Sequence, residues 1–308
     1  MTAFDLRRHG ARFAPEYPPH GHSDHLPMTW LALGALGAGA DRRQRFAADY
    51  LPRLAPLPPA DAHRRRVEVL GEAMTRRGVD TVLEERLPEL MSGWCRAAYH
   101  PAIRLAYGRA FGVVEEAAAG LAYLESNGPC PRLADLAARA RPGEAAPGAG
   151  ALDGLAGTVR RAGPARPFRD GASQALRHPA LVRAAVTLED NLARSSRDAL
   201  AAFAASHDFF ALHLVTGSHA FGLLGELIGP RADALLNLGL AVGYLAIGAP
   251  ALDRSRAQSP SVDRAALLAS CRDDEHDIKL AWTAWDQSRR LADPTYLVVA
   301  HDYLARRG

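Results

Sequence analysis

The chain contains 308 residues, of which 48% are hydrophobic, so it is long enough to form one large domain with a sizeable core. Its net charge of +3 gives no electrostatic reason to expect a nucleic-acid partner. The three cysteines are far apart and show no CxxC spacing, which argues against a disulfide framework and favours a reducing compartment. No segment typical of a signal peptide is visible, and we expect a cytoplasmic protein with no membrane partner.

Helical periodicity runs through most of the sequence, with apolar residues recurring at three- and four-residue spacing. The N-terminal part predicts a helix directly after His25, with Pro27 in its first turn, and another helix over residues 60–77. Pro101 suits the first turn of a helix that continues towards Ser126. No alternating β-branched run indicates a strand, so the expected fold is all-α.

The same helical pattern continues in the second half of the chain. A stretch rich in Pro, Gly and Ala near residues 141–157 predicts a loop within a single domain that covers residues 1–308. Residues 195–215 have helical spacing. The uncharged run over residues 234–252 predicts a buried core helix, with a membrane span as the alternative. The final helix is expected to begin at Asp293-Pro294.

Residues 20–25 read HGHSDH, the HxHxDH spacing of zinc-dependent hydrolases of the metallo-β-lactamase type. In those enzymes the motif follows a buried strand in a sheet-rich fold, whereas here it follows RFAPEYPP and precedes a predicted helix. The structural context of the motif is missing, and we therefore reject the hydrolase fold. His20 and His22 are expected to face solvent, while His25 can point into a core.

Other familiar catalytic motifs are absent from the sequence. There is no phosphate loop, no GxSxG elbow and no HExxH or ExxH run, and the glycines of GALGAGA follow no strand, as a dinucleotide fingerprint would. What remains is a group of histidines close to apolar helical segments: His25, His100, His213, His219 and His276. Four other histidines lie among charged or loop residues and are set aside: His9, His63, His178 and His301.

The stretch CRDDEHDIKLAW, residues 271–282, contains Lys279, the only lysine among 37 basic residues. Asp273 or Asp274 can cap a helix here, and acidic residues fill its first turn. His276 and Lys279 are then three residues apart and share one helix face. A surface lysine that escaped a general preference for arginine is the alternative interpretation.

Several separated blocks of the sequence resemble the questin oxidase-like proteins of fungi and bacteria. The blocks are DHLPMTWLALGALGA, YHPAIRLAYG, LHLVTGSHAF and DDEHDIKLAW, of which the last is the most specific, and the helix ending YLVVAHDYL follows them. Together they run from about residue 24 to the C-terminus. Arg104 and Ala106 depart from the second block, where a histidine or other polar residue and a glycine are expected. These differences bear on which substrate the protein binds more than on the metal site that the family implies.

The resemblance implies an all-α domain whose helices pack around a central metal site. Members of the family oxidise aromatic polyketides in secondary metabolism, cleaving or oxygenating a quinone- or hydroquinone-type ring with molecular oxygen. The best-understood members bind a non-haem iron through four histidines and a lysine carboxylated on its amine. Carried over to this chain, the ligands are His25, His100, His213, His276 and Lys279. The implied cofactor is Fe(II), with NADPH as a candidate external reductant.

A carboxylated lysine would explain why Lys279 is not an arginine. A guanidinium is effectively always protonated and cannot be carboxylated, whereas a buried lysine amine beside a cation loses its proton more easily and can add carbon dioxide. The carbamate oxygen is a harder ligand than imidazole and suits iron. For His219 we expect a catalytic role as a base or hydrogen-bond partner behind the ligands, with a packed histidine as the alternative.

Aromatic side chains that could bind a ring substrate are Trp30, Tyr107, Phe209, Phe210, Trp282 and Trp285. Two other classes of function remain open at this point. A redox-inert zinc enzyme could use the same ligands for hydrolysis. A non-catalytic helical binding protein could use the histidines only for hydrogen bonds in its core.

Overall fold

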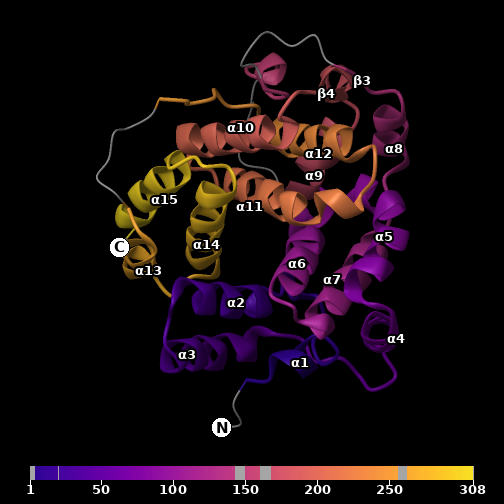
Figure 1. The fold of residues 1–308 in the computed structure, drawn as a ribbon, viewed down its shortest axis with the longest axis vertical. Coiled ribbons are helices and arrows are strands. Elements are labelled where there is room, and N and C mark those ends of the chain that lie inside the picture. Colours follow the sequence, from indigo (N-terminus) through magenta and orange to yellow (C-terminus); the bar gives the residue numbers. More distant parts are fainter. Residues whose placement is uncertain (1–3, 20, 143–149, 160–167, 256–261, 308) are drawn as a thin grey trace. The chain divides into compact units, whose positions relative to one another are not determined.

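The computed structural model describes residues 4–19, 21–142, 150–159, 168–255 and 262–307, and these parts of the chain are mainly helical (Figure 1). Two compact units can be distinguished. Unit 1 is formed by residues 1–82, 103–126 and 256–308, and unit 2 by residues 83–102 and 127–255. The predicted all-α class is confirmed, and the single domain over residues 1–308 stays a prediction.

Both units are built mostly from α-helices. Those of unit 1 are α1 (Leu6–His9), α2 (Leu26–Leu36), α3 (Ala40–Tyr50), α4 (Ala62–Arg77), α7 (Val114–Asn127, with its last residue in unit 2), α13 (Arg264–Ser270), α14 (Glu275–Arg290) and α15 (Thr295–Ala305). Those of unit 2 are α8 (Pro131–Ala138), α9 (Phe168–Ala175), α10 (Asn191–Ser206), α11 (Phe209–Leu224) and α12 (Ala232–Ala246). Two more, α5 (Val79–Leu90) and α6 (His100–Ala110), have residues in both units.

Short 3-10 helices connect several of these elements. They are η1 (Leu51–Arg53) in unit 1, and η2 (Met91–Gly93), η3 (Arg96–Tyr99), η4 (Asp153–Leu155), η5 (Pro179–Ala184) and η6 (Gly225–Leu227) in unit 2. Of the loop predicted near residues 141–157, residues 143–149 lie outside the described part, and η4 follows them.

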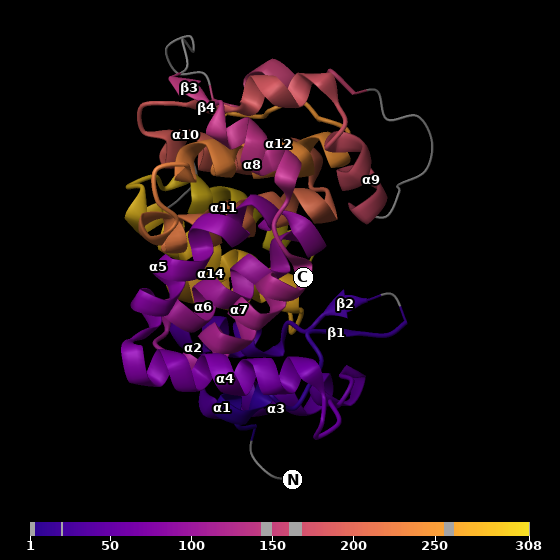
Figure 2. The same ribbon diagram turned by 90° about the vertical axis from the view of Figure 1, so that its right-hand side faces the viewer.

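Four two-residue strands within the described residues correct the prediction that no strand occurs. β1 (Glu16–Tyr17) pairs antiparallel with β2 (His22–Ser23), and β3 (Arg141–Pro142) pairs parallel with β4 (Val186–Thr187). Elements this short cannot show an alternating apolar pattern, so sequence periodicity does not detect them. The β1–β2 hairpin carries His22 and Ser23 of the HGHSDH motif (Figure 2), which agrees with the rejection of the sheet-rich hydrolase fold for this chain. His20, which was expected to face solvent, lies outside the described residues.

Two segments predicted as continuous helices are interrupted. The helix beginning near Pro101 ends at Ala110, and α7 starts after Gly112, whose φ of 66° is left-handed. Residues 195–215 are divided between α10 and α11 because Asp208 caps α11 by accepting hydrogen bonds from the backbone N–H groups of Phe210 and Ala211. A capping carboxylate of this kind starts a new helix where the apolar periodicity alone predicts continuation.

In unit 1, α14 packs against α2 and α15 (Figure 1). Its buried face includes Trp282, whose ring lies 4.3 Å from that of Tyr107, measured between centroids. The final helix follows Asp293-Pro294 as predicted, because the Asp293 carboxylate accepts the backbone N–H of Thr295 at 3.0 Å. The starts of α2 and α14, which carry predicted metal ligands, therefore belong to one packed group of helices.

In unit 2, α12 packs against α9, α10 and α11, and it is buried from Ala234 to Leu245, as predicted for a core helix. Its backbone carbonyls accept hydrogen bonds from two aromatic side chains: Trp94 Nε1 donates to Leu235 at 2.9 Å, and the Tyr99 hydroxyl donates to Gly239 at 2.8 Å. None of the helices in the described ranges is long and apolar enough to cross a membrane.

Gly239 provides a test of this packing. A Cβ atom added there would lie 2.0 Å from Trp94 Nε1, so we expect Gly239→Ala to lower the free energy of unfolding by about 1–3 kcal/mol through overpacking. Gly225 is the matched control, because its φ of −52° suits alanine and its Cβ position has no neighbour within 4 Å. Urea unfolding of both variants measures the difference. Equal stability of the two would contradict the close approach.

Candidate metal centre

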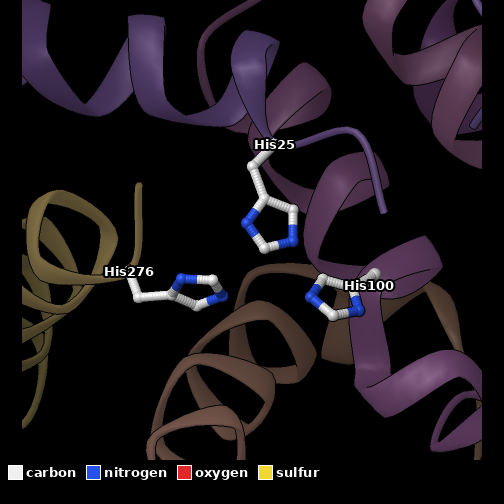
Figure 3. Close-up of side chains that lie close together, drawn as sticks. All are labelled: His25, His100 and His276. Atoms are coloured by element: carbon white, nitrogen blue, oxygen red, sulfur yellow. The ribbon is translucent and has the colours of Figure 1, made fainter. Parts of the chain in front are cut away.

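Unit 1 brings three of the predicted ligands together. His25 is the N-cap residue of α2, and its imidazole centroid lies 4.6 Å from that of His276, at an interplanar angle of 70°. Figure 3 shows these two rings at the starts of their helices. Lys279 Nζ lies 3.2 Å from His25 Nδ1. One turn of α14 thus supplies both an imidazole and an amine to the surroundings of His25.

The first turn of α14 fixes these positions through its cap. Asp274 accepts hydrogen bonds from the backbone N–H groups of His276 and Asp277 at 2.9 and 3.1 Å, as the sequence predicts for one of two aspartates. Carboxylate oxygens of Asp274 and Glu275 also lie 3.8 and 3.9 Å from His276 Nδ1. Negative charge therefore lies beside the Nδ1 edge of this imidazole, which favours a proton on Nδ1 and leaves Nε2 suited to bind a metal.

Lys279 is completely buried, so the interpretation of it as a surface lysine is wrong. Burial lowers the pKa of its amine to about 8, against the opposing effect of the negative charges of Glu275 and Asp274. A larger share of this amine is neutral near pH 7 than of an exposed lysine. The neutral form has the lone pair that carboxylation requires.

Unit 2 brings two further predicted ligands together. His100 and His213 point their Nε2 atoms at each other across 3.1 Å. The Nδ1 atom of His100 lies 2.6 Å from the carbonyl oxygen of Ala97, and that of His213 lies 2.9 Å from the carbonyl oxygen of Phe209. A carbonyl oxygen only accepts, so we assign the proton of each neutral ring to Nδ1.

This assignment gives the pair a geometry that suits two ligands of one metal ion. With both Nδ1 atoms protonated, the two Nε2 lone pairs face each other and repel unless a proton or a metal ion is shared between them. Two nitrogens bound at about 2.1 Å and at a right angle to one ion are about 3.0 Å apart. The observed 3.1 Å matches that separation. Backbone carbonyls that fix the tautomer of a ligand histidine are typical of metal centres.

A left-handed turn places His100. Ala97, Ala98 and Tyr99 have φ values of 47°, 51° and 69°, and His100 follows as the first residue of α6. Such conformations cost roughly 1–2 kcal/mol per residue without glycine. The turn is held by the core, because the Tyr99 hydroxyl donates to the Gly239 carbonyl. The same turn directs the Ala97 carbonyl oxygen to His100 Nδ1.

His219 is buried in α11, the helix that carries His213. Six residues separate the two, which places their side chains about 120° apart around the helix axis. His219 therefore does not share the face of α11 on which His213 meets His100. Its catalytic role stays a prediction.

The aromatic residues singled out in the sequence have different surroundings. Phe209 and Phe210 are next to His213, with ring centroids 5.0 and 5.9 Å from its imidazole, and Phe209 is 51% exposed. Tyr107 and Trp282 pack against each other inside unit 1. Trp30 and Trp285 each have an arginine guanidinium over the ring, from Arg43 and Arg289. Among these six residues, Phe209 combines contact with a predicted ligand and an exposed face, and the half-buried Phe210 contacts the same ligand.

Sequence reasoning missed a buried group in unit 1. His9, which was set aside, is almost completely buried and its Nε2 lies 2.5 Å from an Asp24 carboxylate oxygen. Burial opposes ionisation of Asp24, but His9 and Arg104 outweigh it and hold the pKa of this carboxyl below its usual value. The sign of this group in the sequence was Asp24, the aspartate of the HGHSDH motif. Its role depends on contact with His9, which lies 15 residues earlier in the chain.

A comparison with protein families matches residues 67–284 to the family described as Questin oxidase-like. The chain belongs to the questin oxidase-like family. The match includes His100, His213, His276 and Lys279, whereas His25 precedes it. The comparison with curated proteins found no match. Membership in this family indicates an oxidase or oxygenase.

The turn before His100 yields a prediction about stability. Ala97→Gly should raise the free energy of unfolding by roughly 0.5–1 kcal/mol, because relief of about 1–2 kcal/mol of left-handed strain exceeds the entropic cost of glycine. Ala134, in the right-handed helix α8 and similarly half-buried, is the control, and Ala134→Gly should destabilise by about 1 kcal/mol. Urea unfolding compares them. The same sign of change in both variants would contradict the strained turn.

Proposed function

We propose that this questin oxidase-like chain is a non-haem iron-dependent oxygenase that oxidises or cleaves a quinone- or hydroquinone-type ring of an aromatic polyketide with molecular oxygen. The observation that carries the proposal is the pair formed by His100 and His213, whose tautomers are fixed by backbone carbonyls and whose Nε2 atoms are 3.1 Å apart. Family membership supports the oxidative chemistry.

The ligands we propose are those that the resemblance assigns. His25, His100, His213, His276 and Lys279 would hold one Fe(II), with Lys279 as a carbamate. Imidazole nitrogens bind iron among other transition metals, and an anionic oxygen adds a harder donor that suits iron. Iron held by these five residues would supply reductive activation of molecular oxygen, with NADPH as the proposed external source of electrons.

Carboxylation of Lys279 needs only groups that the chain and the cell provide. The neutral Nζ lone pair attacks carbon dioxide, an N–C bond forms, and the nitrogen releases a proton to give a carbamate. Burial favours the neutral amine, and His25 Nδ1 lies 3.2 Å from Nζ, within reach of the proton that leaves. An anionic carbamate in this buried position would in turn need a cation close to it.

The side chains next to His213 support an aromatic substrate. Phe209 and Phe210 begin α11 one turn before the ligand, and Phe209 presents half of its surface to solvent. A flat ring can stack on or meet the edge of such a side chain and gain roughly 0.5–1.5 kcal/mol beyond its burial. We propose that these two residues contact the substrate ring, and that His219 assists as a base or hydrogen-bond partner.

Metal analysis separates the proposal from its rivals. Iron in the purified protein, with oxygen consumption on a hydroquinone, supports the oxygenase. Zinc as the active metal, with hydrolysis and no oxygen consumption, would support a hydrolase with the same ligands. A folded protein that takes up neither metal would support a non-catalytic helical protein.

The histidine ligands can be tested one at a time. Replacing His25, His100, His213 or His276 by alanine should sharply reduce bound iron, because each removes one donor from a shared ion. His22→Ala is the matched control, since His22 belongs to the same HGHSDH motif as His25 but is exposed. Iron per chain, measured by elemental analysis, is the readout. Full iron content in any of the four variants would contradict the assignment of that histidine as a ligand.

Lys279 is tested by substitutions that separate charge from carboxylation. Lys279→Arg should lose metal and activity, because a guanidinium cannot form a carbamate and is repelled by a neighbouring cation. Lys279→Ala should also lose metal, and short carboxylic acids should partly restore it by supplying an oxygen ligand. Reloading of metal-free wild-type protein should be faster with bicarbonate than in buffer free of carbon dioxide. Full metal content and activity of Lys279→Arg would exclude the carbamate.

A further inference from the structure

A buried cluster of ionisable groups next to His25 has no part in the proposed chemistry. It consists of His9 from α1, Asp24 before α2, Arg104 from α6 and Glu116 from α7, all in unit 1 and each about 1% exposed. We call these four residues the charge cluster. Removing an ion from water costs several kcal/mol even when it is paired, so burial of this many charged groups calls for a reason beyond packing.

The contacts within the charge cluster form a chain that ends at Asp24. Arg104 donates from Nε and Nη2 to the two carboxylate oxygens of Glu116 at 2.9 and 3.2 Å. Its Nη1 lies 3.6 Å from Asp24 Oδ2. His9 Nε2 donates to the same Asp24 oxygen at 2.5 Å, and its ring is held by the rings of Phe4 and Phe13.

The other oxygen of Asp24 acts on the backbone that carries the ligand. Asp24 Oδ1 accepts the backbone N–H of Leu26 at 3.0 Å, so the carboxylate spans His25. The backbone N–H of His25 donates to the Tyr50 hydroxyl at 3.2 Å, and its carbonyl accepts both the backbone N–H and the hydroxyl of Thr29 at 2.9 Å. The backbone of His25 is therefore fixed on both sides, and Asp24 connects it to the charge cluster.

The same contacts exclude a simpler role for Asp24. A carboxylate can bind a metal ion directly, but both oxygens of Asp24 already contact groups of unit 1, namely His9, Leu26 and Arg104. We infer that Asp24 is a positioning residue for His25, and that His9 holds Asp24 in place. The inference rests on the proposed function, because it takes His25 to be a metal ligand.

A pair of charge-removing substitutions tests the inference in the full-length protein. Asp24→Asn removes the carboxylate that spans His25, and Glu116→Gln removes the other carboxylate of the charge cluster, which contacts Arg104 and is not adjacent to a ligand in sequence. Co(II) serves as the probe: its affinity is measured by competition with a chromophoric chelator, and its visible absorption spectrum reports ligand geometry. Unfolding by urea shows how much stability each variant loses.

Asp24→Asn should bind Co(II) about 10- to 100-fold more weakly than wild type, as expected when the support of a ligand is lost, and its Co(II) spectrum should change. Glu116→Gln should lose comparable stability but keep the wild-type spectrum and an affinity close to wild type. Equal losses of affinity in the two variants, or an unchanged Asp24→Asn, would overturn the inference alone. Wild-type protein that binds no Co(II) would overturn the proposed function together with it.

His9 supplies a second test that does not depend on the folding of Asp24→Asn. Glutamine can place an N–H donor close to the position of His9 Nε2, whereas leucine fills the space without a donor. His9→Gln should therefore keep most of the Co(II) affinity and the wild-type spectrum, and His9→Leu should weaken binding as Asp24→Asn does. Identical Co(II) binding by both His9 variants would contradict the positioning role.

Discussion

A lysine amine with no access to water is the constraint around which unit 1 is organised. Burial of Lys279 has to be offset by what surrounds it, and an ammonium there would be costly. The acidic first turn of α14, the imidazole of His25 and the lowered pKa of the amine all reduce that cost. Hydrophobic residues could fill the same space without any of these arrangements, so packing alone does not account for an amine at this position.

The surroundings of Lys279 and of the two histidines of unit 2 use the same physical device. In both, a hydrogen-bonding group outside the candidate centre decides which atom of a side chain faces it. The carbonyls of Ala97 and Phe209 fix two tautomers, and the cap of α14 fixes the backbone of His276. A bare arrangement of imidazoles would leave tautomer and orientation undetermined. These contacts determine which nitrogen of each imidazole faces the candidate centre.

The parts of the fold and the site that depend on local sequence could be predicted. Pro27 after His25 marks the start of α2, Asp274 marks the start of α14, and the three-residue spacing of His276 and Lys279 follows from that start. The division of residues 195–215 and the left-handed turn at Ala97 could not be predicted, because Asp208 and the packing of Tyr99 override helical periodicity. The Asp208 cap is a local contact that apolar spacing does not register, whereas the contact between Tyr99 and Gly239 joins residues that are 140 positions apart.

The charge cluster was missed for a related reason. His9 lies in a short segment with charged neighbours, where a solvated histidine is the usual outcome, and Arg104 was noticed only as a departure from the family. The burial of His9 and of Arg104 is explained by their shared contact with Asp24, and these three residues are far apart in the chain.

Unit 1 is assembled from three stretches of chain, and the last of them begins at residue 256. During synthesis, His25 is therefore made long before the helix that brings His276 and Lys279 to it. Contacts between residues this far apart in sequence form late, so the apolar face of α2 stays without its C-terminal partners until those helices have left the ribosome. Neither unit can be expressed as one uninterrupted fragment, so dissection of this protein would require circular permutation or co-expression of separate pieces rather than truncation.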